Sequence, residues 1–286
     1  MKIKDIISAK AFEKDGFFVI EDFFDVNTIN EIQEFYDSFN FDTNPELNTN
    51  IKSCTKNENI QISDYLKSKY ELEIDKYFDE VQLGGGVFIM KGSGEKSISS
   101  LHQDFNVVDE QKYKSITIWC PLIDVDEQNG CMQFVKGSHQ WFNSIRSFNM
   151  PTCFLDFHLV SEYLVSVSLK KGSVVVFNHS VFHGSKPNYS QNFRPAAAFS
   201  LLSKDATPLH YWRDNKQINV YQIDEDFYNE KAQQLFSGKS SESLQLIDSF
   251  PFKEEYIITE KKVADFLSNK KSVFQRIKTI FNHKIK

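Results

Sequence analysis

Along the first 80 residues, apolar positions recur at intervals of three and four, which is the period of an amphipathic helix. Residues 10–24 predict a short helix, a turn and then a strand. Asp25 can cap a helix over residues 26–39, since an aspartate side chain can accept the free N–H groups of a first helical turn. A further helix is expected from about 61 to 79, whereas residues 40–60 are polar and asparagine-rich and predict a loop.

From three consecutive glycines at 84–86 onward, the pattern changes to short apolar runs separated by turn signals. Such runs predict strands, and many short strands at loose spacing favour a β-sandwich or barrel. Residues 205–260 show a mixed pattern, for which we expect helices beside the β core. The predicted strands are Val87–Met90, Ile116–Cys120, Cys131–Val135, Leu164–Leu169, Val174–Phe177 and Ala196–Leu202.

The length and charge of the chain set broad limits on its class. Single β domains of roughly 200–250 residues are common, so 286 residues are consistent with one domain over 1–286. We expect N-terminal helices in 1–80, a β core over about 81–204 and a C-terminal extension over 205–286. The formal net charge of −6 argues against a general nucleic-acid binder.

The cysteines and the N-terminal segment bear on the cellular compartment. None of the four cysteines belongs to a CxxC pair, and Cys120 and Cys131 lie in strand-like runs, where reduced buried thiols are expected. The first residues carry charges throughout and lack the apolar core of a secretory signal. No run approaches the roughly 20 apolar residues of a membrane span. A reducing cytoplasm is therefore the expected location.

Residues 270–286 contain six Lys or Arg residues, no acid and an apolar stripe. This pattern predicts a basic amphipathic helix. We favour an interpretation in which the apolar stripe docks on the core. Contact with a membrane surface or with a partner protein is the alternative.

Two clusters of polar residues carry the strongest chemical signal. His102 and Asp104 are two positions apart, so on a strand their side chains share one face. A distant second histidine, His183, can complete a face of two imidazoles and one carboxylate on non-heme iron(II), with other coordination positions left open. Arg194 adds a permanent cation with a planar fork, which suits a dicarboxylate cosubstrate. Together these residues predict an iron-dependent oxygenase that uses 2-oxoglutarate.

Two further histidines compete for a role. His179 lies four residues before His183 and is the rival third ligand. We favour His183, because Gly184 and Ser185 follow it and because Arg194 lies eleven positions later. His139, in a Gly-Ser-His turn, is expected to be structural, with a substrate contact as the alternative.

Four segments of the chain resemble the phytanoyl-CoA dioxygenase family of iron(II)- and 2-oxoglutarate-dependent oxygenases. Together they cover most of residues 10–202. The segments are DGFFVIEDFF at 15–24, LHQDFN at 101–106, TIWCPLIDVDEQNGCMQFVKGSHQW at 117–141 and GSVVVFNHSVFHGSKPNYSQNFRPAAAFSL at 172–201.

The resemblance implies a mainly β fold with flanking helices, namely a double-stranded β-helix, or cupin-like jelly roll, that holds the metal between its sheets. It implies that His102, Asp104 and His183 bind iron(II). It also implies that Arg194 binds the distal carboxylate of 2-oxoglutarate, with Ser185 as a hydrogen-bond donor.

Two weaker correspondences follow from the same resemblance. Trp119 occupies the position of a tryptophan that lines the cosubstrate pocket, although a tryptophan here also fits an ordinary core position. Lys91 aligns with a family lysine, but residues 91–94 lack the proline-containing turn that is more usual in the family.

The implied reaction consumes O2 and 2-oxoglutarate and yields succinate and CO2. Halogenating relatives lack the carboxylate ligand, so Asp104 favours hydroxylation of a C–H bond. The expected substrate is a small metabolite or an acyl or glycosyl conjugate of a biosynthetic pathway, acyl-CoA being one candidate. Epimerisation, desaturation and ring closure are alternative outcomes. A jelly-roll protein that binds a metal or a sugar without catalysis is the alternative from another class.

Overall fold

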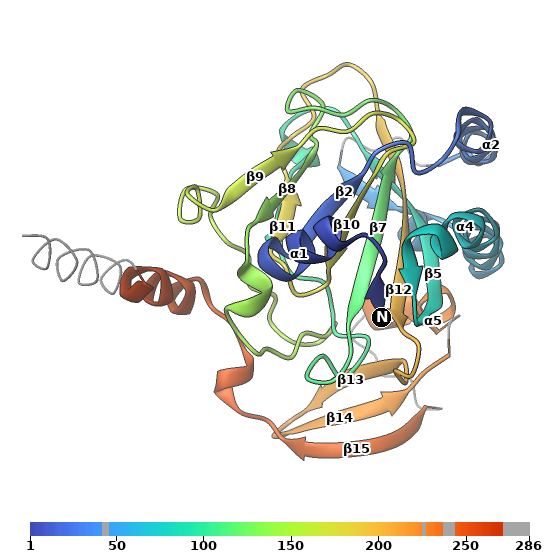
Figure 1. Cartoon of the computed structure of the whole chain (residues 1–286). Helices are drawn as coiled ribbons and strands as arrows, with labels where there is room; N and C mark the ends of the chain where they lie inside the picture. Colours follow the sequence, from blue (N-terminus) through green and yellow to red (C-terminus); the bar gives the residue numbers. More distant parts are fainter. Residues whose placement is uncertain (42–45, 225–226, 237–243, 271–286) are drawn as a thin grey trace, which may run out of the picture.

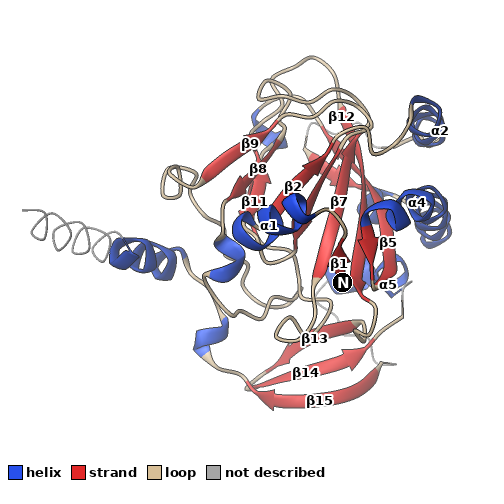
Figure 2. Cartoon of the chain, viewed as in Figure 1, coloured by secondary structure: helices blue, strands red, loops and turns tan. Residues whose placement is uncertain are grey.

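The computed structural model describes residues 1–41, 46–224, 227–236 and 244–270, and two antiparallel sheets form its centre (Figure 1; Figure 2). The major sheet has the order β2 (Phe17–Ile20), β10 (Val174–Asn178), β7 (Ser115–Pro121), β12 (Arg194–Ser203), β5 (Val81–Lys91) and β3 (Leu47–Thr49). The minor sheet has the order β6 (Ser99–His102), β11 (His183–Ser185), β8 (Met132–Val135) and β9 (Leu164–Val167). This two-sheet sandwich confirms the predicted jelly roll.

Apolar residues from the two sheets meet in a shared interior. Trp119 and Phe177 of the major sheet belong to the same buried cluster as Met132 and Phe134 of the minor sheet. Every residue of β7 is buried, because its alternate side chains face the sandwich interior on one side and the covering helices on the other.

Helices cover the outer face of the major sheet. They are α1 (Ile6–Asp15), α2 (Val26–Asp37), α3 (Asn50–Ser53) and α4 (Lys56–Tyr77), and an apolar cluster joins α1, α2 and α4 to the strands. Asp25 caps α2 as predicted, since its side chain accepts the N–H of Thr28. At Gly86 a β-carbon would lie 2.7 Å from Leu66 Cβ, so glycine lets α4 approach β5 closely.

The loop predicted over 40–60 is wrong for most of its length. Strand β3 and helix α3 lie within it, and α4 begins at Lys56 rather than near residue 61. Thr55 and Glu58 form a capping box at this point, with each side chain satisfying a backbone N–H of the other residue. Residues 42–45 lie outside the described part of the chain.

The region 205–260 is richer in strands than predicted. Strands β13 (Leu209–Asp214), β14 (Gln217–Gln222) and β15 (Gln245–Pro251) form a third antiparallel sheet, and α5 (Phe227–Phe236) is the main helix of this region. Figure 1 shows this sheet below the sandwich, at the end of the molecule where α5 lies. A two-stranded pairing of β1 (Lys2–Ile3) with β4 (Phe78–Asp79) completes the sheets of the described residues.

The outer face of the minor sheet packs against a later part of the chain. Ile258, Val263 and Leu267 share a buried cluster with Leu101 and Phe182. Residues 260–270 are helical, whereas 271–286 lie outside the described residues, so the amphipathic tail stays a prediction. Among the described residues, no helix combines the length and the apolar character needed to cross a membrane. The four cysteines are free, and Cys120 and Cys131 are buried, as expected.

Candidate active site

The site lies at one end of the β6–β11 pairing, where His102 and His183 are direct cross-strand partners. Their ring centroids are 4.6 Å apart. Asp104 follows β6, and its Oδ1 lies 3.9 Å from His102 Nε2 and 3.6 Å from His183 Nε2. The potential ligand atoms of the three residues all lie within 4.8 Å of one another. Strand pairing therefore brings His102 and His183, which are 81 positions apart in the sequence, into one small volume.

The hydrogen bonds of both imidazoles point Nε2 toward that volume. His102 Nδ1 lies 2.8 Å from the carbonyl oxygen of Ser100, and His183 Nδ1 lies 3.0 Å from that of Val181. A carbonyl can only accept, so Nδ1 carries the proton and Nε2 keeps its lone pair. This is the tautomer that a metal-binding histidine needs, with the second nitrogen oriented by a backbone carbonyl.

The charge states of His183 and Asp104 also suit a divalent cation. Burial lowers the pKa of His183 to about 4, so its imidazole is neutral near pH 7. Burial acts to raise the pKa of Asp104, but the neighbouring His183, His179, His102 and Arg146 outweigh it and hold the pKa below the ordinary value. Two imidazoles and one carboxylate form the donor set that non-heme iron(II) takes on one face.

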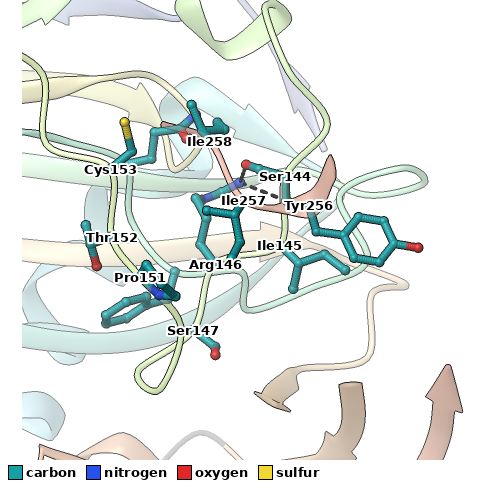
Figure 3. Close-up of a pocket in the computed structure, with 12 residues that line it drawn as sticks. Ser144, Ile145, Arg146, Ser147, Pro151, Thr152, Cys153, Tyr256, Ile257 and Ile258 are labelled. Carbon is teal, nitrogen blue, oxygen red and sulfur yellow. Dashed lines mark hydrogen bonds between the residues drawn. The ribbon is translucent and has the colours of Figure 1, made fainter. Parts of the chain in front are cut away.

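Arg146 fixes the segment that carries Asp104, a role that no motif in the sequence indicated. Its Nε donates to the carbonyl oxygen of Asp104, and its Nη2 lies 2.6 Å from a carboxylate oxygen of Glu110. Its Nη1 also donates to Ser144, and Figure 3 shows Arg146 and Ser144 beside a small cavity of about 20 Å³. The backbone N–H of Asp104 in turn donates to the carbonyl of His179, 2.9 Å away.

Two buried cations lie side by side where β5 meets β12. Arg194 and Lys91 are cross-strand partners, and their exposed fractions are 1% and 0%. Among the described residues, neither has a carboxylate within ion-pairing distance. Burial, with Arg194 as a second cause, lowers the pKa of Lys91 to about 7, and burial lowers the pKa of Arg194 to about 10.

The contacts of these cations are neutral. Arg194 Nη1 donates to the carbonyl of Gly130 at 3.0 Å, Lys91 Nζ donates to the carbonyl of Ser97, and the Arg194 guanidinium lies 4.9 Å from the Trp119 ring centroid. Arg194 Nε and Trp119 Nε1 are buried donors without a partner. Unpaired buried donors beside two uncompensated charges fit a bound anion.

The other predicted residues divide between the site and the scaffold. Ser185 is buried on β11, two positions after His183, with a register shift between them. His179 is buried but lies outside the triad, with its Nε2 3.0 Å from Thr117 Oγ1. His139 packs against the end of α1, where its Nε2 lies 3.2 Å from the carbonyl of Glu13, consistent with the structural interpretation.

A cavity of about 510 Å³ adjoins the triad, since Asp104 lines it. His179, which is outside the triad, also lines this cavity. Strands β5, β7 and β12 form one wall, and residues of the C-terminal region, such as Tyr228 and Asn229, form another. The pattern of residues 205–260 gave no signal for these contributions. A molecule in this cavity would lie directly beside the carboxylate of Asp104.

Comparison with known proteins agrees with this geometry. The family model "Phytanoyl-CoA dioxygenase (PhyH)" matches residues 12–196. A phytanoyl-CoA dioxygenase domain-containing protein 1 homolog of Dictyostelium discoideum is 26% identical over 132 residues, covering 43% of this chain and 47% of that protein. The peroxisomal phytanoyl-CoA dioxygenase of Bos taurus is 30% identical over 121 residues, covering 36% of this chain and 34% of that protein. The chain thus spans less than half the length of these two curated relatives.

Solved structures share the fold. EvdO2 of Micromonospora carbonacea var. aurantiaca, crystallised with 2-oxoglutarate, gives a TM-score of 0.54 at 17% identity, covering 70% of this chain and 91% of that chain. The epimerase SnoN of nogalamycin biosynthesis gives a TM-score of 0.50 at 17% identity, covering 71% and 84%. The family model covers well over half of the residues, and the chain therefore belongs to the phytanoyl-CoA dioxygenase family.

Proposed function

We propose that the protein is an iron(II)- and 2-oxoglutarate-dependent dioxygenase that hydroxylates a C–H bond of a small metabolite or of an acyl or glycosyl conjugate. The observation that carries the proposal is the convergence of two imidazole Nε2 atoms and a carboxylate on one small volume. The buried pair Lys91 and Arg194, which has no carboxylate partner among the described residues, supports the cosubstrate part of it. The donor set suits iron(II), and the uncompensated cations suit a dicarboxylate.

In this proposal His102, Asp104 and His183 hold iron(II) on one face. The Oδ1 atom of Asp104 lies 3.6 and 3.9 Å from the two imidazole Nε2 atoms, so these three donors would bind one ion together. When bound, iron with 2-oxoglutarate and O2 supplies the oxidation of a C–H bond, with succinate and CO2 as coproducts.

Arg194 and Lys91 hold the cosubstrate. The guanidinium fork binds the distal carboxylate, while Trp119 packs against the guanidinium and fixes its plane. The ammonium of Lys91 supplies a second positive charge, and Ser185 supplies a hydroxyl donor. A dianion entering this pocket would compensate both charges, so binding removes an electrostatic cost that the protein alone carries.

The remaining role of the protein is to position a substrate carbon near the triad. The cavity beside Asp104 would hold the substrate near the triad. A substrate carbon misplaced by about 1 Å can cost on the order of 10²-fold in rate. Which carbon lies nearest the triad also decides between hydroxylation and the alternative outcomes of epimerisation, desaturation or ring closure. A protein that only binds a metal or sugar would gain nothing from the buried pair Lys91 and Arg194.

The test is uncoupled turnover, which is the conversion of 2-oxoglutarate to succinate without oxidation of a substrate. The purified protein, supplied with iron(II), 2-oxoglutarate, ascorbate and air, should form succinate even without its substrate. Asp104→Ala and Arg194→Ala should lose this activity. Arg213→Ala is the matched control, because Arg213 also stacks on an aromatic ring, 3.7 Å from the Phe252 centroid, but lies on β13. Equal background succinate in all four proteins would refute the proposal.

A further inference from the structure

The cavity beside the triad has a marked charge bias. No lysine or arginine occurs among the described residues that line its 510 Å³. Its charged side chains are acidic: Asp104 of the triad and the exposed Asp224. An anionic group would lose its hydration on entry and find no lysine or arginine among these residues to compensate its charge.

Aromatic rings form a continuous part of the wall. Phe105 and Phe148 have centroids 4.3 Å apart, and Phe148 and Tyr228 are stacked at 5.8 Å, all three lining the cavity. Aliphatic side chains such as Leu83, Val87 and Leu202 line the opposite strands. A ring or a hydrocarbon segment between these surfaces would bury apolar area on both of its faces.

One polar group on the lining has no partner. Asn229 Nδ2 is buried and makes no hydrogen bond, and the residue is 6% exposed. Buried amide groups are nearly always paired in folded proteins. The amide Nδ2 of Asn229 can only donate, so its missing partner is an acceptor such as a carbonyl, ether or hydroxyl oxygen.

We infer that the substrate is an uncharged, largely apolar small molecule that carries an oxygen acceptor for Asn229 and a ring or chain that packs on Phe148 and Tyr228. This inference rests on the proposed function, because it takes the cavity beside the triad as the substrate site. A free carboxylic acid, or a substrate whose phosphate groups lie inside this cavity, does not satisfy it.

Three probes of nearly equal shape test the inference. They are the uncharged ketone 2-acetylnaphthalene, the anion 2-naphthoate and the hydrocarbon 2-isopropenylnaphthalene. Binding is measured by equilibrium dialysis without iron or 2-oxoglutarate. The ketone should bind at least about tenfold more tightly than the anion. It should bind about fivefold more tightly than the hydrocarbon, which corresponds to one net hydrogen bond. In Asn229→Leu the ketone and the hydrocarbon should bind equally.

Val87→Trp places an indole ring in the cavity and should weaken binding of all three probes at least about tenfold. Leu72→Trp is the matched control at an exposed position on α4 and should bind as the wild type does. Tight binding of the naphthoate, no binding of the ketone up to its solubility limit, or ketone binding that Val87→Trp leaves unchanged would each overturn the inference. Succinate formation is measured separately. If the probes do not bind as expected but succinate still forms, only the inferred substrate class is rejected. If the probes bind as expected but no succinate forms, the proposed oxygenase activity is rejected.

Discussion

Lys91 and Arg194 face each other across the β5–β12 pairing, both buried and both without a carboxylate partner among the described residues. Two like charges in a poorly hydrated place repel each other and lose hydration. The folded protein carries this cost for as long as the pocket holds no anion. The pair therefore links three measurable properties: stability, pH dependence and cosubstrate binding.

The pH dependence of unfolding should reveal Lys91. Burial lowers its pKa from 10.5 to about 7, so between these values the unfolded chain binds more protons than the folded one. Stability without cosubstrate should therefore rise with pH in this window, by about 1 kcal/mol between pH 7 and pH 8. Urea unfolding of the wild type and of Lys91→Met checks this: the variant should lack this rise, and identical pH profiles would contradict the prediction.

The backbone of Gly130 lies against the side chains of both Lys91 and Arg194. Its φ is +78°, a β-carbon there would lie 2.7 Å from Lys91 Cε, and its carbonyl accepts from Arg194. Gly130→Ala should destabilise the fold by about 1–3 kcal/mol and raise the KM for 2-oxoglutarate about tenfold, because both cations would be displaced. Steady-state kinetics and thermal unfolding measure the two effects. Gly137→Ala is the control, since Gly137 also has a positive φ but its β-carbon would lie no closer than 3.3 Å to another atom, the carbonyl oxygen of Lys14. An unchanged KM in Gly130→Ala would show that the backbone there does not position the cations.

Arg146 should act as a positioning residue for Asp104. Arg146→Met removes the donor to the Asp104 carbonyl and the ion pair with Glu110, but leaves every triad side chain in place. Metal affinity should fall by about 10- to 100-fold, as is usual when a group that orients a ligand is lost. Calorimetric titration with Ni(II) reports this independently of turnover. Affinity equal to that of the wild type would show that the loop holds Asp104 by itself.

The choice between His183 and His179 can be settled by the same titration. His183→Ala should weaken Ni(II) binding by more than about 100-fold, because it removes a ligand. His179→Ala should leave affinity close to the wild-type value, since the His179 ring lies against Thr117 and its contact with Asp104 runs through the backbone carbonyl, which alanine keeps. The reverse ranking would reassign the third ligand.

Local patterns were sufficient to predict the β core and the position of α2. The continuous apolar runs of β7, β10 and β12 predicted strands because both faces of these strands are buried, and Asp25 marked the start of α2 directly. The start of α4 was misplaced, because the capping box at Thr55 lies inside a polar stretch that looked like loop.

His102, Asp104 and His183 lie close together, and Lys91 pairs with Arg194, but the residues that surround them were not foreseen. His102 and His183 could be paired from their motif context. Arg146 sits in an irregular segment with no periodicity, and its contact with Asp104 depends on how that segment folds back. Asn229 and Tyr228 reach the cavity only through the packing of the C-terminal region, which no local signal encodes.

The apolar cluster on the outer face of the minor sheet limits how far the chain can be truncated from its C-terminal end. Leu101 and Phe182, the immediate neighbours of His102 and His183, rest on Ile258, Val263 and Leu267, far beyond the last residue of the family match at 196. A shortened chain that stopped at the last jelly-roll strand would keep every proposed ligand and yet present the back of its ligand-bearing sheet to water. The smallest unit that keeps both faces of this sheet covered, as a piece of protein to express, transplant or recombine, therefore extends at least through residue 267.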